Sequence, residues 1–225
     1  MTITTVLFDL DGTLADTAPD LALALNMQRE RHGLPPLPQE IIRPHASHGS
    51  RGLLGIGFSL TPEDATFPAM RDEYLGLYDQ VFTHAPQLFP GMDEVLNALQ
   101  NAGVQWGVVT NKPARFTIRL MQALNLADAA ACIVSGDDAE RAKPYPDTLL
   151  LACEQARCRP ESCLYVGDAE RDILAGRAAG MQTMVACWGY LGEDDAPESW
   201  QADFMIAAPH QLLRILGLSE PSSAV

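Results

Sequence analysis

The sequence has little positive charge, no long apolar run and no obvious leader segment. Lys and Arg number 15 against 29 Asp and Glu, which gives a formal net charge of −14. Such a surplus of negative charge argues against nucleic acids and anionic membranes as partners. No apolar run approaches the ~20 residues that cross a bilayer, and the N-terminus lacks the charged and then apolar pattern of a signal peptide. We therefore expect a soluble, cytoplasmic protein, either a monomer or a homodimer.

The five cysteines are odd in number and contain no Cys-x-x-Cys pair. This pattern favours neither a disulfide framework nor a zinc site. Cys132, Cys163 and Cys187 lie in apolar, strand-like runs. A buried thiol in such a run behaves as a small apolar side chain, so we expect these cysteines to serve packing.

The most informative segment is the pair Asp9 and Asp11, directly after the apolar run 6–8. Side chains two positions apart on an extended chain share a face, and open α/β sheets bind ligands at the carboxyl ends of their strands. Two neighbouring carboxylates repel each other unless a cation or a proton compensates. Gly12 allows a sharp turn, and Thr13 adds a hydroxyl. The segment predicts a ligand site, with a solvated Asp-Gly turn as the simpler alternative.

Further polar clusters follow other strand-like runs. They are Thr110 and Asn111 after run 104–109, Lys143 downstream of run 132–134, and Asp168 and Asp172 after run 163–166. The carboxyl ends of parallel strands meet at one edge of a sheet, so we expect these side chains to converge with Asp9. Carboxylates, a hydroxyl and an ammonium suit a phosphoryl group and a hard cation, and Mg²⁺ is commonly held by one or two carboxylates plus phosphate. The pattern predicts a phosphoryl site with Mg²⁺.

Helical and strand-like patterns alternate from residue 92 onward. Helices are predicted at 92–102, 113–125, 146–156 and 169–179, and strands at 104–109, 132–134, 163–166 and 182–186. Such alternation is typical of a doubly wound, Rossmann-like α/β parallel sheet with helices on both faces. Residues 16–86 contain helical patterns only. We therefore expect a core of residues 1–15 and 87–218, an inserted helical cap at 16–86 and a flexible tail at 219–225.

Within the insert, two capping boxes are predicted to begin helices, one at Thr17 and one at Thr61. The first precedes a helix at 21–31. An apolar stripe from Met70 to Phe82 has the spacing of an amphipathic helix. Residues 46–52 are predicted to form a loop of small residues.

Four motifs occur in order after the expected strands: DLDGT at 9–13, VVTN at 108–111, the pair Lys143 and Pro144, and GDAERD at 167–172. On these motifs the chain resembles phosphatases of the haloacid dehalogenase superfamily, and within it the phosphoglycolate phosphatase group, which includes an N-acetylmuramic acid 6-phosphate phosphatase branch. The resemblance extends to about residue 217.

The resemblance implies a role for each motif residue. Asp9 would attack phosphorus and Asp11 would act as acid and then base, while Thr110 and Lys143 hold the phosphoryl oxygens. Asp9, the backbone carbonyl of Asp11, and Asp168 would bind Mg²⁺, with Asp172 in support. Thr13 and Asn111 would contact substrate. His48 and Arg51, in the 46–52 segment, would lie over the active site, where a guanidinium could form a fork with a carboxylate or a sugar oxygen. A solvated or helix-capping Arg51 stays open.

The implied function is Mg²⁺-dependent hydrolysis of a small phosphorylated metabolite through an aspartyl-phosphate. 2-Phosphoglycolate is the first expected substrate, and N-acetylmuramic acid 6-phosphate is the alternative. A phosphosugar mutase would carry the same motifs. A non-catalytic phospho-acceptor switch is the alternative from another class, and it would need neither Asp11 nor a cap of about 70 residues.

Overall fold

The structure is a computed structural model that describes residues 2–84 and 86–219. Most of the tail predicted at 219–225 therefore lies outside the described residues. Within the described part of the chain, no helix is long and apolar enough to span a membrane.

The core is a six-stranded parallel sheet in the order β5-β4-β1-β6-β7-β8. Its strands are β1 (Thr5–Phe8), β4 (Gln105–Val109), β5 (Ile133–Val134), β6 (Cys163–Gly167), β7 (Gln182–Ala186) and β8 (Phe204–Ile206). The chain builds one side of the sheet through β4 and β5 and then returns to pair β6 with β1. This reversal beside β1 is a topological switch point, where open α/β sheets bind ligands at the carboxyl ends of the strands. The doubly wound α/β prediction is confirmed.

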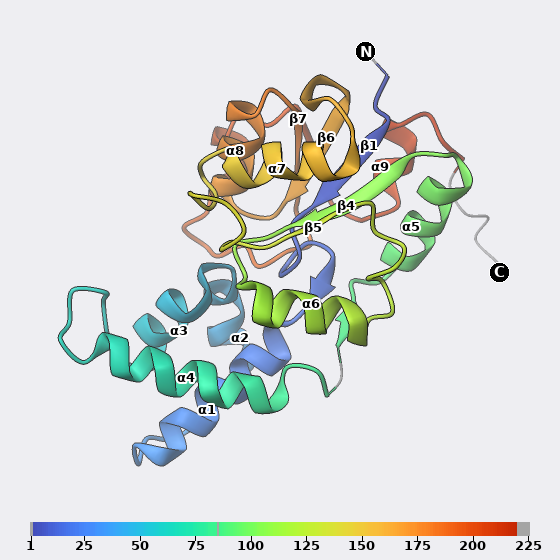
Figure 1. Cartoon of the computed structure of the whole chain (residues 1–225). Coiled ribbons are helices and arrows are strands. Elements are labelled where there is room, and N and C mark those ends of the chain that lie inside the picture. Colours follow the sequence, from blue (N-terminus) through green and yellow to red (C-terminus); the bar gives the residue numbers. More distant parts are fainter. Residues whose placement is uncertain (1, 85, 220–225) are drawn as a thin grey trace.

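Helices cover both faces of the sheet (Figure 1). They are α5 (Met92–Asn101), α6 (Ala114–Ala123), α7 (Asp147–Ala156), α8 (Glu170–Ala178) and α9 (Gln211–Ile215). Because side chains alternate along a strand, Val6 and Phe8 enter the core that includes α5, α6 and α9, while Leu7 enters the other core with α7 and α8. The central strand β1 thus has two buried faces, as expected for a parallel sheet, whereas the edge strand β8 leaves Met205 exposed.

The segment between the first strand and α5 forms a separate group of helices. It contains α1 (Ala18–Arg31), α2 (Gln39–Ile42), the short 3-10 helix η1 (Arg43–His48), α3 (Gly49–Phe58) and α4 (Phe67–Val81). Figure 1 shows α1 to α4 gathered on one side of the core, and we call them the helical cap. The two chain connections to the cap pair with each other as antiparallel strands β2 (Ala15–Asp16) and β3 (Gln87–Leu88).

The apolar stripe on α4 is confirmed as a packing surface. Tyr74, Leu77 and Tyr78 are buried, and the rings of Tyr78 and Phe82 both contact Phe116 of α6. The cap therefore packs directly on the core through α4 and α6.

Three local predictions in the cap are wrong. The Thr17 side chain makes no capping bond to α1, because its hydroxyl donates to Asp11 while the Tyr190 hydroxyl accepts from the backbone N–H groups of Thr17 and Ala18. At Thr61 no helix begins, since Asp64 closes a turn and α4 starts at Phe67. The predicted loop 46–52 consists of the end of η1 and the first turn of α3.

Several elements have no counterpart in the sequence predictions. Strand β8, helix α9 and the β2–β3 pair are all five residues or shorter. Segments of this length do not complete enough periods for a pattern to emerge.

Candidate active site

Three carboxylates meet at the switch point of the sheet. Asp9 follows β1, Asp168 follows β6, and Asp172 lies in the first turn of α8. One oxygen from each lies within 4.8 Å of the others, and the three residues are at most 2% exposed. Burial and the charge of Asp9 raise the pKa of Asp168 to about 7, and burial raises the pKa of Asp9 although Lys143 opposes the rise. Positive charge nearby is therefore needed to stabilise the ionised form of these carboxylates.

Lys143 supplies part of that charge. Its Nζ lies 3.0 Å from Asp9 and 2.7 Å from Asp172, and the side chain is fully buried. The same ammonium donates to the carbonyl of Val109 and to the hydroxyl of Tyr165. Its backbone is fixed as well, since the amide side chain of Asn111 accepts from the Lys143 N–H and donates to the Lys143 carbonyl. Asn111 thus positions Lys143.

Backbone groups and the cap hold Asp168 in place. The Tyr190 N–H donates to Asp168 at 2.9 Å, and the hydroxyl of Ser47, in η1 of the cap, donates at 2.7 Å. The Thr13 hydroxyl lies 3.4 Å away. Gly12 has φ +85°, and a Cβ at this position would collide with the Asp168 carboxylate. Only glycine therefore fits here beside the acid.

The three carboxylates fit a hard divalent cation. Three buried carboxylates with one buried ammonium in direct contact leave net negative charge, which is costly away from water unless it is compensated. Oxygen donors of this kind are those that Mg²⁺ prefers. Arg171 is half-buried beside them, and its positive charge opposes the rise that burial causes in the pKa values of Asp9 and Asp168. Among residues 2–84 and 86–219, it forms no hydrogen bond with either carboxylate.

The Asp11 carboxylate lies apart from this cluster and faces the cap. Lys112 Nζ is 2.9 Å and 3.2 Å from its two oxygens, and the Thr17 hydroxyl donates to it as well. Lys112 also donates to the hydroxyl of Tyr78 on α4 at 2.9 Å. Asp11, Lys112 and Tyr78 therefore form a bridge between core and cap.

A cavity of about 530 Å³ lies between the core and the cap. The core contributes Asp9, Asp11, Thr110, Asn111, Lys112 and Arg171 to its lining, and the cap contributes His48, Ser50, Arg51, Arg71 and Tyr78. His48 and Arg51 line this cavity from the cap. Desolvation and the nearby charge of Arg171 lower the pKa of His48, which keeps the imidazole neutral at pH 7. Thr13 lies behind Asp168 and is not among the lining residues.

Several contributors to this site carried no predicted role, among them Ser47, Arg71, Tyr78, Lys112 and Arg171. Lys112 and Arg171 stand inside or next to the motifs, so their position along the chain was the available signal. Ser47 lies in the 46–52 segment that was expected over the active site, so its position was a signal as well, whereas Tyr78 and Arg71 lie on a helix whose apolar stripe indicated packing only.

The carboxylate cluster, the buried ammonium and the cavity beneath the cap suit the binding of a phosphoryl group and a cation at the switch point. The family model for haloacid dehalogenase-like hydrolases matches residues 6–186, and the chain belongs to this family.

Relatives of known name agree on a phosphatase. The chain is 39% identical to an N-acetylmuramic acid 6-phosphate phosphatase of Pseudomonas aeruginosa over 96% of each chain. It is 42% identical to a phosphoglycolate phosphatase of Xanthomonas campestris, over 92% of this chain and 93% of that one. A crystal structure described as a predicted phosphoglycolate phosphatase from Haemophilus somnus has the same fold, with a TM-score of 0.82 at 24% identity over 96% of this chain and 98% of the other. The chain is a phosphatase of the haloacid dehalogenase-like family.

Proposed function

We propose that the protein hydrolyses a small phosphate monoester that carries a carboxylate, through an aspartyl-phosphate on Asp9 and with Mg²⁺ as cofactor. The observation that carries this proposal is the cluster of Asp9, Asp168, Asp172 and Lys143 beneath a cavity lined by cap cations. Nucleophilic catalysis by a carboxylate splits a difficult displacement into two easier steps.

Each residue has a defined task in this scheme. Asp9 attacks phosphorus. Lys143 contacts the Asp9 carboxylate and binds a phosphoryl oxygen, which brings the two reacting groups close to each other. Asp11, on the cap side of the cavity, gives a proton to the leaving oxygen and later takes one from water. Thr110, buried beside Asp9 in the cavity lining, offers its hydroxyl to the phosphoryl group. Positioning and charge neutralisation of this kind are the main demands of phosphoryl transfer.

Mg²⁺ would be held by Asp9, Asp168 and Asp172, with the Asp11 carbonyl as a further ligand, and would neutralise charge on the transferred group. The burial of these three carboxylates and the closeness of their oxygens support a cation at this place.

Two substrates fit the chemistry of the cavity. 2-Phosphoglycolate and N-acetylmuramic acid 6-phosphate both carry a carboxylate, which Arg51 or Arg71 in the cap lining suits through the fork geometry of a guanidinium. 2-Phosphoglycolate is the first candidate. The second is favoured by volume, because about 530 Å³ lies within the ~300–1,000 Å³ typical of drug-sized ligands and exceeds what a two-carbon acid fills.

The helical cap supports the choice of a hydrolase over a phospho-acceptor switch, since a lid that closes over the cavity selects substrates and excludes water. A reducing compartment such as the cytoplasm is supported by the five unpaired cysteines.

A substrate panel with release of inorganic phosphate as readout tests the proposal. It contains 2-phosphoglycolate, N-acetylmuramic acid 6-phosphate, the same sugar phosphate without its carboxylate-bearing group, glucose 6-phosphate and a nucleotide. We expect the two carboxylate-bearing esters to have the highest kcat/KM. Equal rates for N-acetylmuramic acid 6-phosphate and its carboxylate-free analogue would contradict carboxylate recognition. Conversion of a sugar phosphate into its isomer without phosphate release would indicate a mutase.

A further inference from the structure

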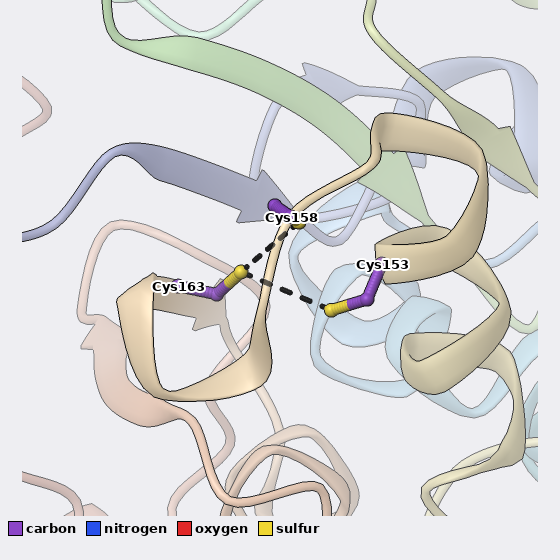
Figure 2. A group of neighbouring side chains, drawn as sticks. All are labelled: Cys153, Cys158 and Cys163. Carbon is purple, nitrogen blue, oxygen red and sulfur yellow. Dashed lines mark hydrogen bonds between the residues drawn. The ribbon is translucent and has the colours of Figure 1, made fainter.

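Three cysteines meet at the end of the core opposite the carboxylates. Cys153 lies on α7, Cys158 in the connection that follows, and Cys163 is the first residue of β6. Figure 2 shows their side chains turned toward one another. The Sγ of Cys163 is 3.4 Å from that of Cys158 and 3.9 Å from that of Cys153. The spacing of five residues matches neither a helix face nor a Cys-x-x-Cys motif, so the sequence pattern did not predict this cluster.

The three thiols differ in their access to solvent. Cys163 and Cys153 are 0% and 5% exposed, whereas Cys158 is half-buried. Cys158 also lines a second cavity, of about 560 Å³, between the exposed side chains of Arg157 and Arg159. A small oxidant can therefore reach Cys158 from solvent, while its two neighbours are shielded behind it.

The surroundings of the cluster favour an uncharged product. Leu7, Val109 and Leu149 belong to the same buried apolar cluster as Cys153 and Cys163. A metal bound by three thiolates would bring ligand charge into this apolar region, which is costly. Among residues 2–84 and 86–219, the group also holds no fourth Cys, His, Asp or Glu. A disulfide carries no charge.

We propose that Cys158 and Cys163 form a thiol-oxidation site, in which a hydroperoxide converts the two thiols into a disulfide while Cys153 remains a thiol. In the first step Cys158 sulfur takes an oxygen from the hydroperoxide, whose O–O bond breaks, giving a sulfenic acid and, from hydrogen peroxide, water. In the second step Cys163 sulfur attacks the sulfenic sulfur, the S–O bond breaks, and the oxygen leaves as water with the thiol proton. Two thiols and one peroxide thus give one disulfide and two waters.

The pKa values of the three thiols differ. Hydrogen bonding from Cys163 lowers the pKa of the Cys153 thiol, whereas burial raises the pKa of Cys158, and hydrogen bonding with Cys153 together with burial raises the pKa of Cys163. Because the thiolate is the attacking form, what favours the disulfide here is the 3.4 Å distance between the Cys158 and Cys163 sulfurs and not the acidity of these two thiols.

Peroxide titration followed by peptide mass spectrometry tests the site. The whole protein is reduced, desalted, treated with hydrogen peroxide, alkylated and digested with trypsin without reduction. Cys158 and Cys163 stay within one peptide, 158–171, because trypsin does not cleave the Arg159–Pro160 bond. We expect two of the five thiols to be lost and this peptide to be unalkylated and lighter by two hydrogens. Cys187→Ser, at a half-buried cysteine outside the cluster, should behave as wild type, and Cys158→Ser should retain all its remaining thiols at the same dose.

Four results would overturn the proposal. The first is five alkylatable thiols in wild type after peroxide, and the second is oxidation of Cys187 before the pair. The third is a reduced protein that retains one Zn²⁺ after desalting and in which this metal, without peroxide, protects Cys158 and Cys163 from alkylation. The fourth is disulfide formation that is no faster in the folded protein than in guanidinium, whereas faster formation in the folded protein would support the role of the folded cluster.

Discussion

Replacing Lys112 with methionine would remove the ammonium that joins the acid Asp11 to the cap. Methionine keeps an unbranched apolar side chain of similar length, so packing of the stem is largely retained. The loss is confined to the contacts of Nζ, at 2.9 and 3.2 Å to the Asp11 oxygens and 2.9 Å to the Tyr78 hydroxyl. The side chains of Lys112 and Asp11 are only 6% and 16% exposed, so water replaces the lost partner poorly.

The magnitude follows from the charge on these bonds. A hydrogen bond between charged groups contributes about 1.5 to 3 kcal/mol, and a partly buried carboxylate that loses its partner costs a similar amount. If that energy positions Asp11 for proton transfer, kcat should fall by about 10- to 150-fold with a smaller change in KM. The free energy of unfolding should fall by about 1.5 to 3 kcal/mol.

The assay is steady-state hydrolysis of an aryl phosphate at saturating Mg²⁺, together with urea unfolding. Arg119→Met is the matched control, because Arg119 on α6 pairs with Asp79 on α4 across the same core–cap contact but both side chains are about half exposed. Exposed pairs contribute about 0–1 kcal/mol, so this variant should stay close to wild type. A Lys112→Met enzyme within twofold of wild type, or an equal loss in Arg119→Met, would refute the positioning of Asp11 by Lys112.

Four further outcomes are expected. Asp9→Asn should keep the circular dichroism spectrum and abolish phosphate release, because a carboxamide does not attack phosphorus; turnover within tenfold of wild type would contradict the covalent scheme. EDTA should stop hydrolysis and Mg²⁺ should restore it, whereas Ca²⁺ should not, since its looser coordination misplaces the reacting groups; full activity in EDTA would exclude the metal site. Tyr190→Phe should lower the free energy of unfolding in urea by about 1 to 3 kcal/mol, because the N–H groups of Thr17 and Ala18 lose their acceptor; an unchanged midpoint would mean that another group replaces it. Arg51→Ala should lower kcat/KM about 10- to 100-fold on the carboxylate-bearing substrate and leave an aryl phosphate unaffected; equal losses on both would place Arg51 in the fold or at the phosphoryl group.

The convergence of the motif residues could be predicted because parallel topology fixes where strands end. β1 pairs in parallel with both β4 and β6, so Asp9, Thr110 and Asp168 follow three neighbouring strands at one edge. The alternation of helices and strands was enough to predict this topology. Lys143 required more, since eight residues separate it from the end of β5, and the side chain of Asn111 holds its backbone in place.

Contacts between distant segments could not be predicted, because no periodic pattern encodes them. The predicted capping box of α1 failed since the acceptor for its first N–H groups comes from Tyr190, 173 positions along the chain from Thr17. In the same way, Lys112 meets Asp11 across 101 positions. Each such pair satisfies a buried polar group, as folded proteins require, but the partner is chosen by the packed arrangement and not by neighbours in sequence.

Tyr190 shows how these distant contacts join the cap to the carboxylate cluster. Its backbone N–H donates to Asp168, while its hydroxyl donates to Asp16 in β2 and accepts from the first turn of α1. Asp16 in turn pairs with Arg43 of the cap, whose guanidinium lies 4.9 Å from the Tyr190 ring. One residue therefore contacts an acid of the cluster, a strand that leads into the cap and a helix of the cap. Ser47 of the cap also donates a hydrogen bond to Asp168. Any displacement of η1 must therefore either break this hydrogen bond or move the Asp168 carboxylate with it. The cap and the proposed metal ligand are thus mechanically connected.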